Sequence, residues 1–306
     1  MDILRAATTQ ARPYYGAIIY PESGIFLPVN DNTELEIGFG NGEYTVQCAR
    51  LNPDTLYYGV EVSQACVLRC ARRAEGLDNL RLINTDARYM LRELFADESF
   101  SRIIMQFPCP WSKNADAHRR VTAKDFADGL AAVLKVGGVF EMVTDDEPYA
   151  NEVRRVLGGH EALRAEIFEV NPSRIITTKY ERKWLAEGRN IYRVTFRKMG
   201  AFTAQRRVSQ EMHIKIQRVI TGEAVESLRN IEGHGEKSFW KFGRTFTDGD
   251  IYLLETLTSD DEFEQKFYIH IAPHGEGSLL RLDKTAKAFL TPSVRSALND
   301  AAQRLS

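Results

Sequence analysis

The chain has 306 residues, of which 43% are hydrophobic and 27% charged, a composition typical of a globular protein long enough for two domains. Its formal net charge of −2 is not that of a basic nucleic-acid-binding protein, so any RNA contact must come from local patches. The first residues do not resemble a signal peptide, and no apolar run approaches the roughly 20 residues of a membrane span. The four cysteines have irregular spacing, typical of neither a zinc site nor a disulfide framework. We therefore expect a protein of the reducing cytoplasm without a metal.

A strand, a glycine-rich turn and a helix open the first predicted domain. Residues 35–39 alternate in the manner of a strand, and residues 44–50 have the pattern of a helix. Between them, three glycines occupy alternate positions, beginning with Gly38, and the missing Cβ atoms let a nucleotide-like ligand approach the backbone. The G-x-G-x-G spacing, with Glu36 inside the strand and no phosphate-binding lysine after the turn, favours S-adenosylmethionine over a dinucleotide.

Strands and helices continue to alternate through the rest of this domain. We predict strands at residues 56–62, 80–84, 100–107, 139–144, 165–170 and 190–197, and helices at 64–74, 123–134 and 149–157. This alternation predicts a parallel, doubly wound sheet, whose ligands lie beyond the C-terminal ends of the strands. Glu61, Asp86, Cys109 and Asp145 all fall at such ends. The first of them follows the glycine turn by about twenty residues, where an acid can accept both ribose hydroxyls.

The pattern changes after Gly200, and we predict a cofactor-binding domain at residues 1–202 and a smaller α+β domain at 203–306. Residues 238–246 and 251–258 alternate like the strands of a hairpin, and residues 267–271 form a further strand. Residues 292–305 have helical spacing of the apolar side chains Val294, Leu298, Ala301 and Leu305.

Basic and aromatic residues interleave in the second domain, a pattern that can bind phosphates and stack on exposed bases. They are Arg206, Arg207, Lys215, Arg218, Lys237, Trp240, Lys241 and Arg244. The same domain carries acids, among them Asp260, Asp261 and Glu262, which are equally typical of a solvated charged surface. Both interpretations of the pattern stay open.

Five sequence blocks in order, over roughly residues 20–198, resemble the bacterial tRNA (guanine-N7)-methyltransferase family. They lie at residues 35–43, 59–61, 86–87, 107–120 and 178–181. Among methyltransferases, the Phe-Pro-x-Pro-Trp and Thr-Lys-Tyr-Glu blocks are specific to this family. The resemblance implies a Rossmann-like α/β methyltransferase sheet that carries a second, smaller α+β domain. It also implies methyl transfer from S-adenosylmethionine to N7 of guanosine at position 46 in the variable loop of tRNA.

The resemblance also implies roles for individual residues. Glu36 would contact the methionine end of the cofactor, Glu61 its ribose and Asp86 its adenine. The implied cofactor-binding set is Glu36, Gly38, Gly40, Glu61, Asp86 and Cys109. The implied substrate-binding set is Lys113, Arg119, Arg120, Asp145, Thr178, Lys179, Tyr180 and Glu181, with Asp145 and Glu181 as catalytic residues. Since guanine presents two donors on its Watson–Crick edge, either carboxylate can accept both, while the basic side chains hold phosphates.

Two departures from the family pattern leave alternatives open. The family has an acid between the two prolines where this chain has Cys109, and its basic tract is thinned at residues 113–120. A catalytically impaired RNA-binding protein, or a methyltransferase acting on a different RNA, are the alternatives. We interpret Cys109 as a small packing residue, because N7 chemistry does not require a covalent nucleophile. Both a monomer and a homodimer fit the sequence.

Overall fold

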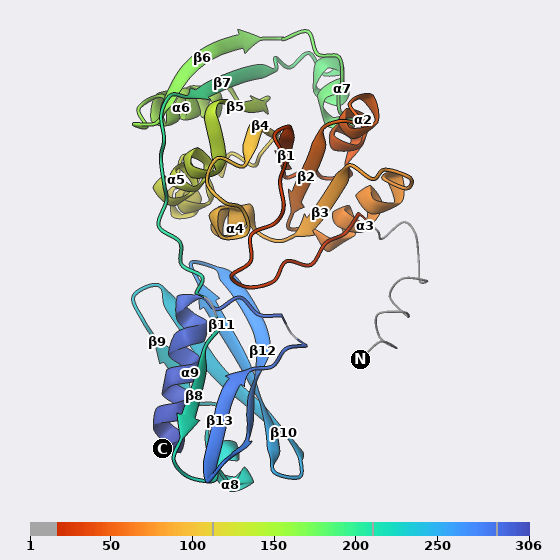
Figure 1. Cartoon of the computed structure of the whole chain (residues 1–306). Coiled ribbons are helices and arrows are strands. Elements are labelled where there is room, and N and C mark those ends of the chain that lie inside the picture. The colour runs from red at the N-terminus through yellow and green to blue at the C-terminus, as the bar shows by residue number, and fades with distance from the viewer. Residues whose placement is uncertain (1–16, 112, 210, 286) are drawn as a thin grey trace. The chain divides into compact units, whose positions relative to one another are not determined.

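The computed structural model describes residues 17–111, 113–209, 211–285 and 287–306. They form two compact units (Figure 1). Of these residues, the first unit takes 17–21 and Phe26–Gln205, and the second takes Glu22–Ile25 and those from Arg206 to Ser306. No helix of these residues is both long and apolar enough to cross a membrane.

The first unit is a seven-stranded sheet flanked by helices (Figure 1). Its strands are β1 (Thr33–Ile37), β2 (Leu56–Glu61), β3 (Leu80–Asn84), β4 (Phe100–Gln106), β5 (Leu134–Thr144), β6 (Leu163–Val170) and β7 (Tyr192–Lys198). Its helices are α2 (Glu43–Leu51), α3 (Gln64–Arg73), α4 (Ala87–Leu94), α5 (Lys124–Val133), α6 (Glu147–Gly158) and α7 (Lys179–Ala186), with a 3-10 helix at Asn114–Arg119. Helices α4 and α7 are not among the predicted elements, and Leu134, predicted to end a helix, begins β5.

The strand order is β3-β2-β1-β4-β5-β7-β6, and β7 runs antiparallel to both of its neighbours. The predicted parallel pairing is confirmed for β1 to β5, whereas the strand predicted at residues 190–197 is antiparallel to its neighbours. The segment between β6 and β7 forms α7, whose residues line a cavity together with the glycine turn. Because this connection stays at the C-terminal end of the sheet and does not cross a sheet face, β7 returns in the opposite direction.

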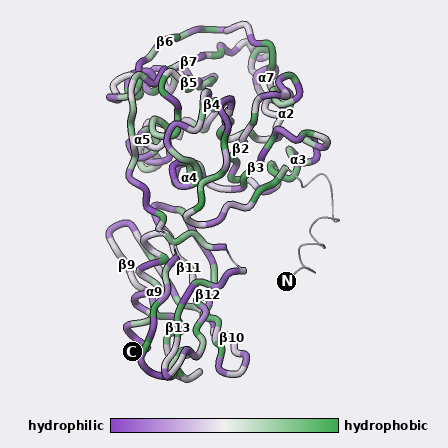
Figure 2. The backbone as a smooth tube through the Cα atoms, in the orientation of Figure 1, coloured by the Kyte–Doolittle hydropathy of each residue, from purple (hydrophilic) through white to green (hydrophobic). Residues whose placement is uncertain are grey.

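The second unit is a six-stranded antiparallel sheet with a long helix. Its elements are β8 (His213–Ile216), α8 (Gly222–Glu226), β9 (Glu232–His234), β10 (Ser238–Asp248), β11 (Ile251–Asp260), β12 (Phe263–His274), β13 (Gly277–Leu282) and α9 (Pro292–Leu305), with strand order β8-β13-β12-β11-β10-β9. Buried and more exposed residues alternate along β11, and Figure 2 shows the hydropathy of the backbone in both units. The predicted apolar face of α9 is buried, at Val294, Leu298, Ala301 and Leu305.

Many of the interleaved basic and aromatic residues are engaged within this unit. Trp240 lies partly buried against the core, and its Nε1–H donates to Asp300 of α9 at 2.9 Å. Arg244 lies 3.5 Å from a Glu255 carboxylate oxygen, and Arg218 donates to the carbonyl of Leu305. An indole held in this way is not an open stacking platform, so these contacts fit a structural role for Trp240.

Candidate active site

The turn after β1 requires glycine at its start and at its end for two different physical reasons. Gly38, Gly40 and Gly42 all have φ between +53° and +75°, which favours glycine. Nothing lies within 4 Å of a Cβ placed on either of the first two, so their backbone faces open space. A Cβ on Gly42 would lie 2.1 Å from Sγ of Cys70, so this glycine lets the start of α2 pack against α3.

Glu61, the last residue of β2, is hydrogen-bonded to the glycine turn. Its Oε2 accepts a hydrogen bond from the backbone N–H of Gly40 at 3.0 Å, and its Oε1 accepts one from Ser63 at 2.9 Å. A carboxylate has about four acceptor positions, so both oxygens can accept further donors. The acid therefore fixes the turn and still presents acceptor capacity to the cavity that it lines.

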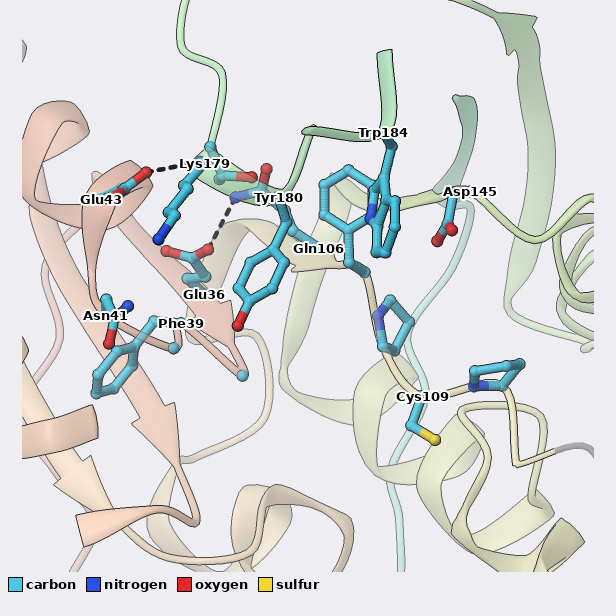
Figure 3. A pocket seen from close by; sticks show the side chains of 16 residues that line it. Glu36, Phe39, Asn41, Glu43, Gln106, Cys109, Asp145, Lys179, Tyr180 and Trp184 are labelled. Carbon is cyan, nitrogen blue, oxygen red and sulfur yellow. Dashed lines mark hydrogen bonds between the residues drawn. The ribbon is translucent and has the colours of Figure 1, made fainter. Parts of the chain in front are cut away.

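Two cavities meet at Gly38, Pro108 and Cys109, which line both of them. The first has a volume of about 400 Å³ and is lined by Glu36, Gly38, Phe39, Gly40, Asn41, Glu43, Gln106, Phe107, Pro108, Cys109, Pro110, Asp145, Thr178, Lys179, Tyr180 and Trp184 (Figure 3). The second has a volume of about 210 Å³, and Glu61, Asp86, Arg119 and Trp111 are among its lining residues. A long ligand could extend from one cavity into the other across the shared residues.

Glu36 carries a buried carboxylate at the wall of the first cavity. The residue is 4% exposed, and its Oε1 accepts a hydrogen bond from Nε2 of Gln106 at 2.8 Å. Its Oε2 is buried and has no hydrogen-bond partner among the described residues. Burial raises the pKa of Glu36 to about 7. A buried oxygen without a donor is destabilising, so this atom is suited to receive a donor or cation from a ligand.

A buried arginine that the sequence analysis did not single out continues this network. Nη2 of Arg174 donates to Oε1 of Gln106 at 2.5 Å, and its Nη1 donates to Oε2 of Glu181 at 2.6 Å. The two charged side chains are 5% and 2% exposed. The guanidinium also lies 5.6 Å from the ring centroid of Tyr44. Glu181 is therefore part of a buried ion pair, and it does not line either cavity.

Helix α7 forms one wall of the first cavity. Thr178 caps it by accepting a hydrogen bond from the N–H of Glu181, and the N–H of Lys179 donates to Glu43 at 2.7 Å. Figure 3 shows Tyr180 and Trp184 projecting from this helix into the cavity, between Glu36 and Asp145. The Thr-Lys-Tyr-Glu block thus supplies three residues that line the cavity, the first of which also caps the helix, and one buried anchor.

Asp145, which follows β5 directly, lies at the end of the same cavity that is away from Glu36 (Figure 3). Its Oδ2 accepts a hydrogen bond from Arg189 at 3.0 Å. The same guanidinium lies 4.1 Å from the ring centroid of Trp184. A carboxylate, a guanidinium and an indole are therefore held together where a flat, polar base could stack and donate hydrogen bonds.

Asp86 and Arg119, which line the second cavity, both contact other side chains of the protein. Asp86 caps α4 by accepting from the N–H of Arg88, and both of its carboxylate oxygens accept hydrogen bonds from the Arg88 side chain. Arg119 lies over the ring of Trp111 at 4.8 Å. Both Asp86 and Arg119 line the cavity.

The loop after β4 corrects one prediction and leaves the substrate-binding roles of Lys113 and Arg120 as predictions. Cys109 is exposed and lines both cavities, so its interpretation as a packing residue was wrong. Arg120 donates to the carbonyl oxygens of Pro110 and Trp111 and to Glu152, and these bonds brace the loop. Lys113 is exposed and lines neither cavity.

The structure thus brings most of the predicted residues to two adjoining cavities, while Lys113, Arg120 and Glu181 lie outside their linings. Sequence reasoning missed Gln106, Trp184 and Arg174. The first could have been noticed as a polar residue at the end of an apolar strand. Arg174 lies in an irregular segment and contacts residues 68 and 7 positions away, so the sequence offers no local signal for it.

The residues present fit S-adenosylmethionine. Glu36 offers an unpartnered buried acceptor for a cationic amino group, and Glu61 keeps acceptor capacity for ribose hydroxyls. The open backbone of Gly38 and Gly40 lies between these two acids. This sheet, turn and pair of acids define a Rossmann-like, S-adenosylmethionine-dependent methyltransferase.

The family described as "Putative methyltransferase" matches residues 30–194, and the chain belongs to this family. A tRNA (guanine-N(7)-)-methyltransferase of Thermotoga maritima is 33% identical over 86% of this chain and 86% of its own. A protein of the same name from Aquifex aeolicus is 30% identical over 90% of this chain and 94% of its own. Matches of this extent cannot be contained in residues 1–205, so the similarity reaches into the second unit.

Among solved structures, the antibiotic-resistance methyltransferase Kmr is 16% identical, with a TM-score of 0.42, over 56% of this chain and 89% of that protein.

Proposed function

We propose that this protein transfers a methyl group from S-adenosylmethionine to N7 of guanosine in tRNA, at position 46 of the variable loop. The family match and the names of the two relatives support the reaction class. The observation that carries the proposal is the pair of adjoining cavities. One holds Glu61 and Asp86, the other holds Asp145 and Trp184, and Gly38, Pro108 and Cys109 line both.

On the cofactor side, Glu61 would accept the ribose hydroxyls and Asp86 would border the adenine. Glu36 would pair its unpartnered Oε2 with the ammonium of the methionine end. When bound, the cofactor supplies an electrophilic methyl group on a sulfonium. The protein's residues need only fix its position, and positioning alone can contribute several kcal/mol of barrier reduction.

On the substrate side, Asp145 would accept the N1–H and the N2 amine of guanine, while Trp184 and Tyr180 would border the ring. Arg189 already donates a hydrogen bond to Oδ2 of Asp145. When a base binds, Arg189 must therefore move away or donate to the same oxygen together with the base. We assign Glu181 a positioning role in place of direct contact with the base, because it is buried and paired with Arg174.

The chemistry asks little of a general base. N7 of neutral guanine carries an in-plane lone pair, so the protein does not have to remove a proton before attack. Positive charge develops on the base during the transfer, and a carboxylate such as Asp145 stabilises that charge in a partly water-excluded cavity. Cys109 has no covalent step to perform in this reaction, and we propose that its thiol borders the reacting groups.

The tRNA itself would be held by basic side chains near the first cavity. Lys179 lines this cavity, and Lys113 is exposed on the loop after β4. Phosphate contacts of this kind position an RNA without reading its sequence. A cytoplasmic location, where tRNA is modified, accompanies this proposal.

The test is nucleoside analysis. Unmodified tRNA transcript incubated with the full chain and labelled S-adenosylmethionine should yield 7-methylguanosine. A transcript with adenosine at position 46 is the matched control and should yield none. Cofactor binding without methylation of this tRNA, or labelling of the control at the same level, would favour an impaired RNA-binding protein or a different RNA target.

A further inference from the structure

A chain of four buried or nearly buried polar side chains joins the two sides of the site. It runs from Glu36 on β1 through Gln106 on β4 and Arg174 in the segment before α7 to Glu181 on α7. Glu36 and Glu181, at the two ends of this chain, have roles in the proposed function, whereas Gln106 and Arg174 in its middle have none. Arg174 lines neither cavity, so any role that it has must act through its neighbours.

The direction of the hydrogen bonds in the chain is fixed by chemistry. Arginine can only donate, so the oxygen of the Gln106 amide must face Arg174. Its NH₂ group is then turned toward Glu36, where it donates at 2.8 Å. Arg174 therefore selects the amide orientation that supplies one donor to Glu36.

The same arrangement keeps Glu36 incompletely satisfied. Gln106 separates the guanidinium from the Glu36 carboxylate, so no direct ion pair between the two is described. One oxygen of Glu36 stays without a partner in the described part of the chain. A carboxylate that is held in place but left short of one partner is prepared for a cation that enters from the cavity.

Arg174 holds the substrate side as well. Glu181 lies on α7 next to Tyr180 and three positions before Trp184, and both of these line the cavity. The ion pair with Arg174 therefore fixes the rotation of α7 about its axis. A separate anchor, the bond from the N–H of Lys179 to Glu43, fixes the first turn of the helix.

We propose, resting on the proposed function, that Arg174 is a positioning residue that orients Glu36 for the cofactor's ammonium and holds the substrate wall on α7. The two halves of the site would then be energetically coupled through one buried side chain. This role predicts coupling between ligands, which is reciprocal by thermodynamic linkage.

The pH at which cofactor affinity falls depends on the pKa of Glu36, and a merely structural role for Arg174 would not change this pH. Burial raises the pKa of Glu36 to about 7, while the Gln106 hydrogen bond, the charges of Arg174 and Arg102 and, as the smallest contribution, the backbone of Thr45 lower it. Lys179 lines the same cavity, and the Cys48 and Cys70 thiols of α2 and α3 interact electrostatically with the carboxylate. The cofactor's ammonium prefers the anionic carboxylate, so affinity should fall as pH drops through this pKa.

Two substitutions should move this midpoint in opposite directions. Arg174→Gln removes a positive charge, so the pKa of Glu36 rises and the midpoint of cofactor affinity moves to higher pH. Glu181→Gln leaves the arginine without its counter-charge, so the midpoint moves to lower pH. Because one pKa unit is a factor of ten, a shift of about one unit changes affinity about tenfold on the acid side.

The probe is S-adenosylhomocysteine, which carries the same amino-acid end, measured by titration calorimetry between pH 6 and pH 9. We expect Arg174→Gln to bind weakly at pH 7 and to recover at high pH, and Arg174→Lys to retain more of the wild-type profile. Arg182→Gln is the matched control, because Arg182 lies on the same helix but bonds to Thr177 and Glu43. It should leave the midpoint unchanged.

Equal weakening of Arg174→Gln and Glu181→Gln at every pH would overturn the proposal, since general loosening of α7 has that signature. So would a tRNA affinity that responds to S-adenosylhomocysteine as strongly in Arg174→Gln as in the wild type. Failure of the proposed function is a separate result, because it would show as an absence of 7-methylguanosine from wild-type protein that still binds the probe with this pH profile.

Discussion

The carboxylate of Glu61 offers the sharpest test of the cofactor side. It accepts hydrogen bonds from the N–H groups of Gly40 and Ser63, and it lines the cavity where a ribose would lie. Glu61→Ala removes the acceptor for the glycine turn, the acceptor for Ser63 and the acceptors for the ligand. Hydrogen bonds to a charged group contribute about 1.5–3 kcal/mol each. Loss of one such bond to the ligand raises the dissociation constant by about 10- to 150-fold.

The assay is calorimetric titration with S-adenosylhomocysteine, with circular dichroism to establish that the variant is folded. Glu61→Gln is informative, because its amide keeps one acceptor and should lose less affinity than alanine. Glu75→Ala, an exposed acid after α3, is the control and should bind as the wild type does. A folded Glu61→Ala with unchanged affinity would refute the reasoning.

Further predictions follow from the same geometry. Asp145→Ala should reduce turnover on tRNA at least tenfold while changing S-adenosylhomocysteine affinity little; collapse of cofactor binding instead would reject its assignment to the base. Gly42→Ala should destabilise the fold by roughly 2–4 kcal/mol in urea unfolding, from positive φ and overlap with Cys70, whereas Gly76→Ala, with equally positive φ in open space, should cost about 1 kcal/mol. Truncation after Gln205 should lower tRNA affinity and its salt dependence if the second unit binds RNA; unchanged affinity and methylation would give that unit another role.

Much of the first unit could be predicted from local sequence. The strand, glycine turn and helix at its start can be recognised within one short stretch of sequence, without knowledge of contacts elsewhere in the chain. Glu61 could be placed because parallel strands bring their C-terminal ends to one edge of the sheet. These features depend on periodicity and chain order, and both are visible in a single sequence.

The features that could not be predicted depend on tertiary contacts and not on local sequence pattern. The position of β7 between β5 and β6 is a choice of strand pairing, which side-chain alternation does not specify. The role of Glu181 stays a prediction, because its sequence signal is that of an acid at a cavity mouth and does not reveal its buried ion pair with Arg174. Cys109 was expected to pack because cysteine is often buried, whereas the loop after β4 holds it at the open side of both cavities.

The short segment Glu22–Ile25 gives the second unit an unusual order of assembly. It belongs to that unit, where Ser23 accepts a hydrogen bond from the N–H of Leu290. During synthesis this segment leaves the ribosome long before its partner, because Ser23 and Leu290 lie 267 positions apart in the chain. The residues Phe26–Gln205 of the first unit emerge between the two, and domains generally fold as units in the order of synthesis. The second unit can therefore be completed only after Leu290 has emerged, when the residues of the first unit have already been synthesised.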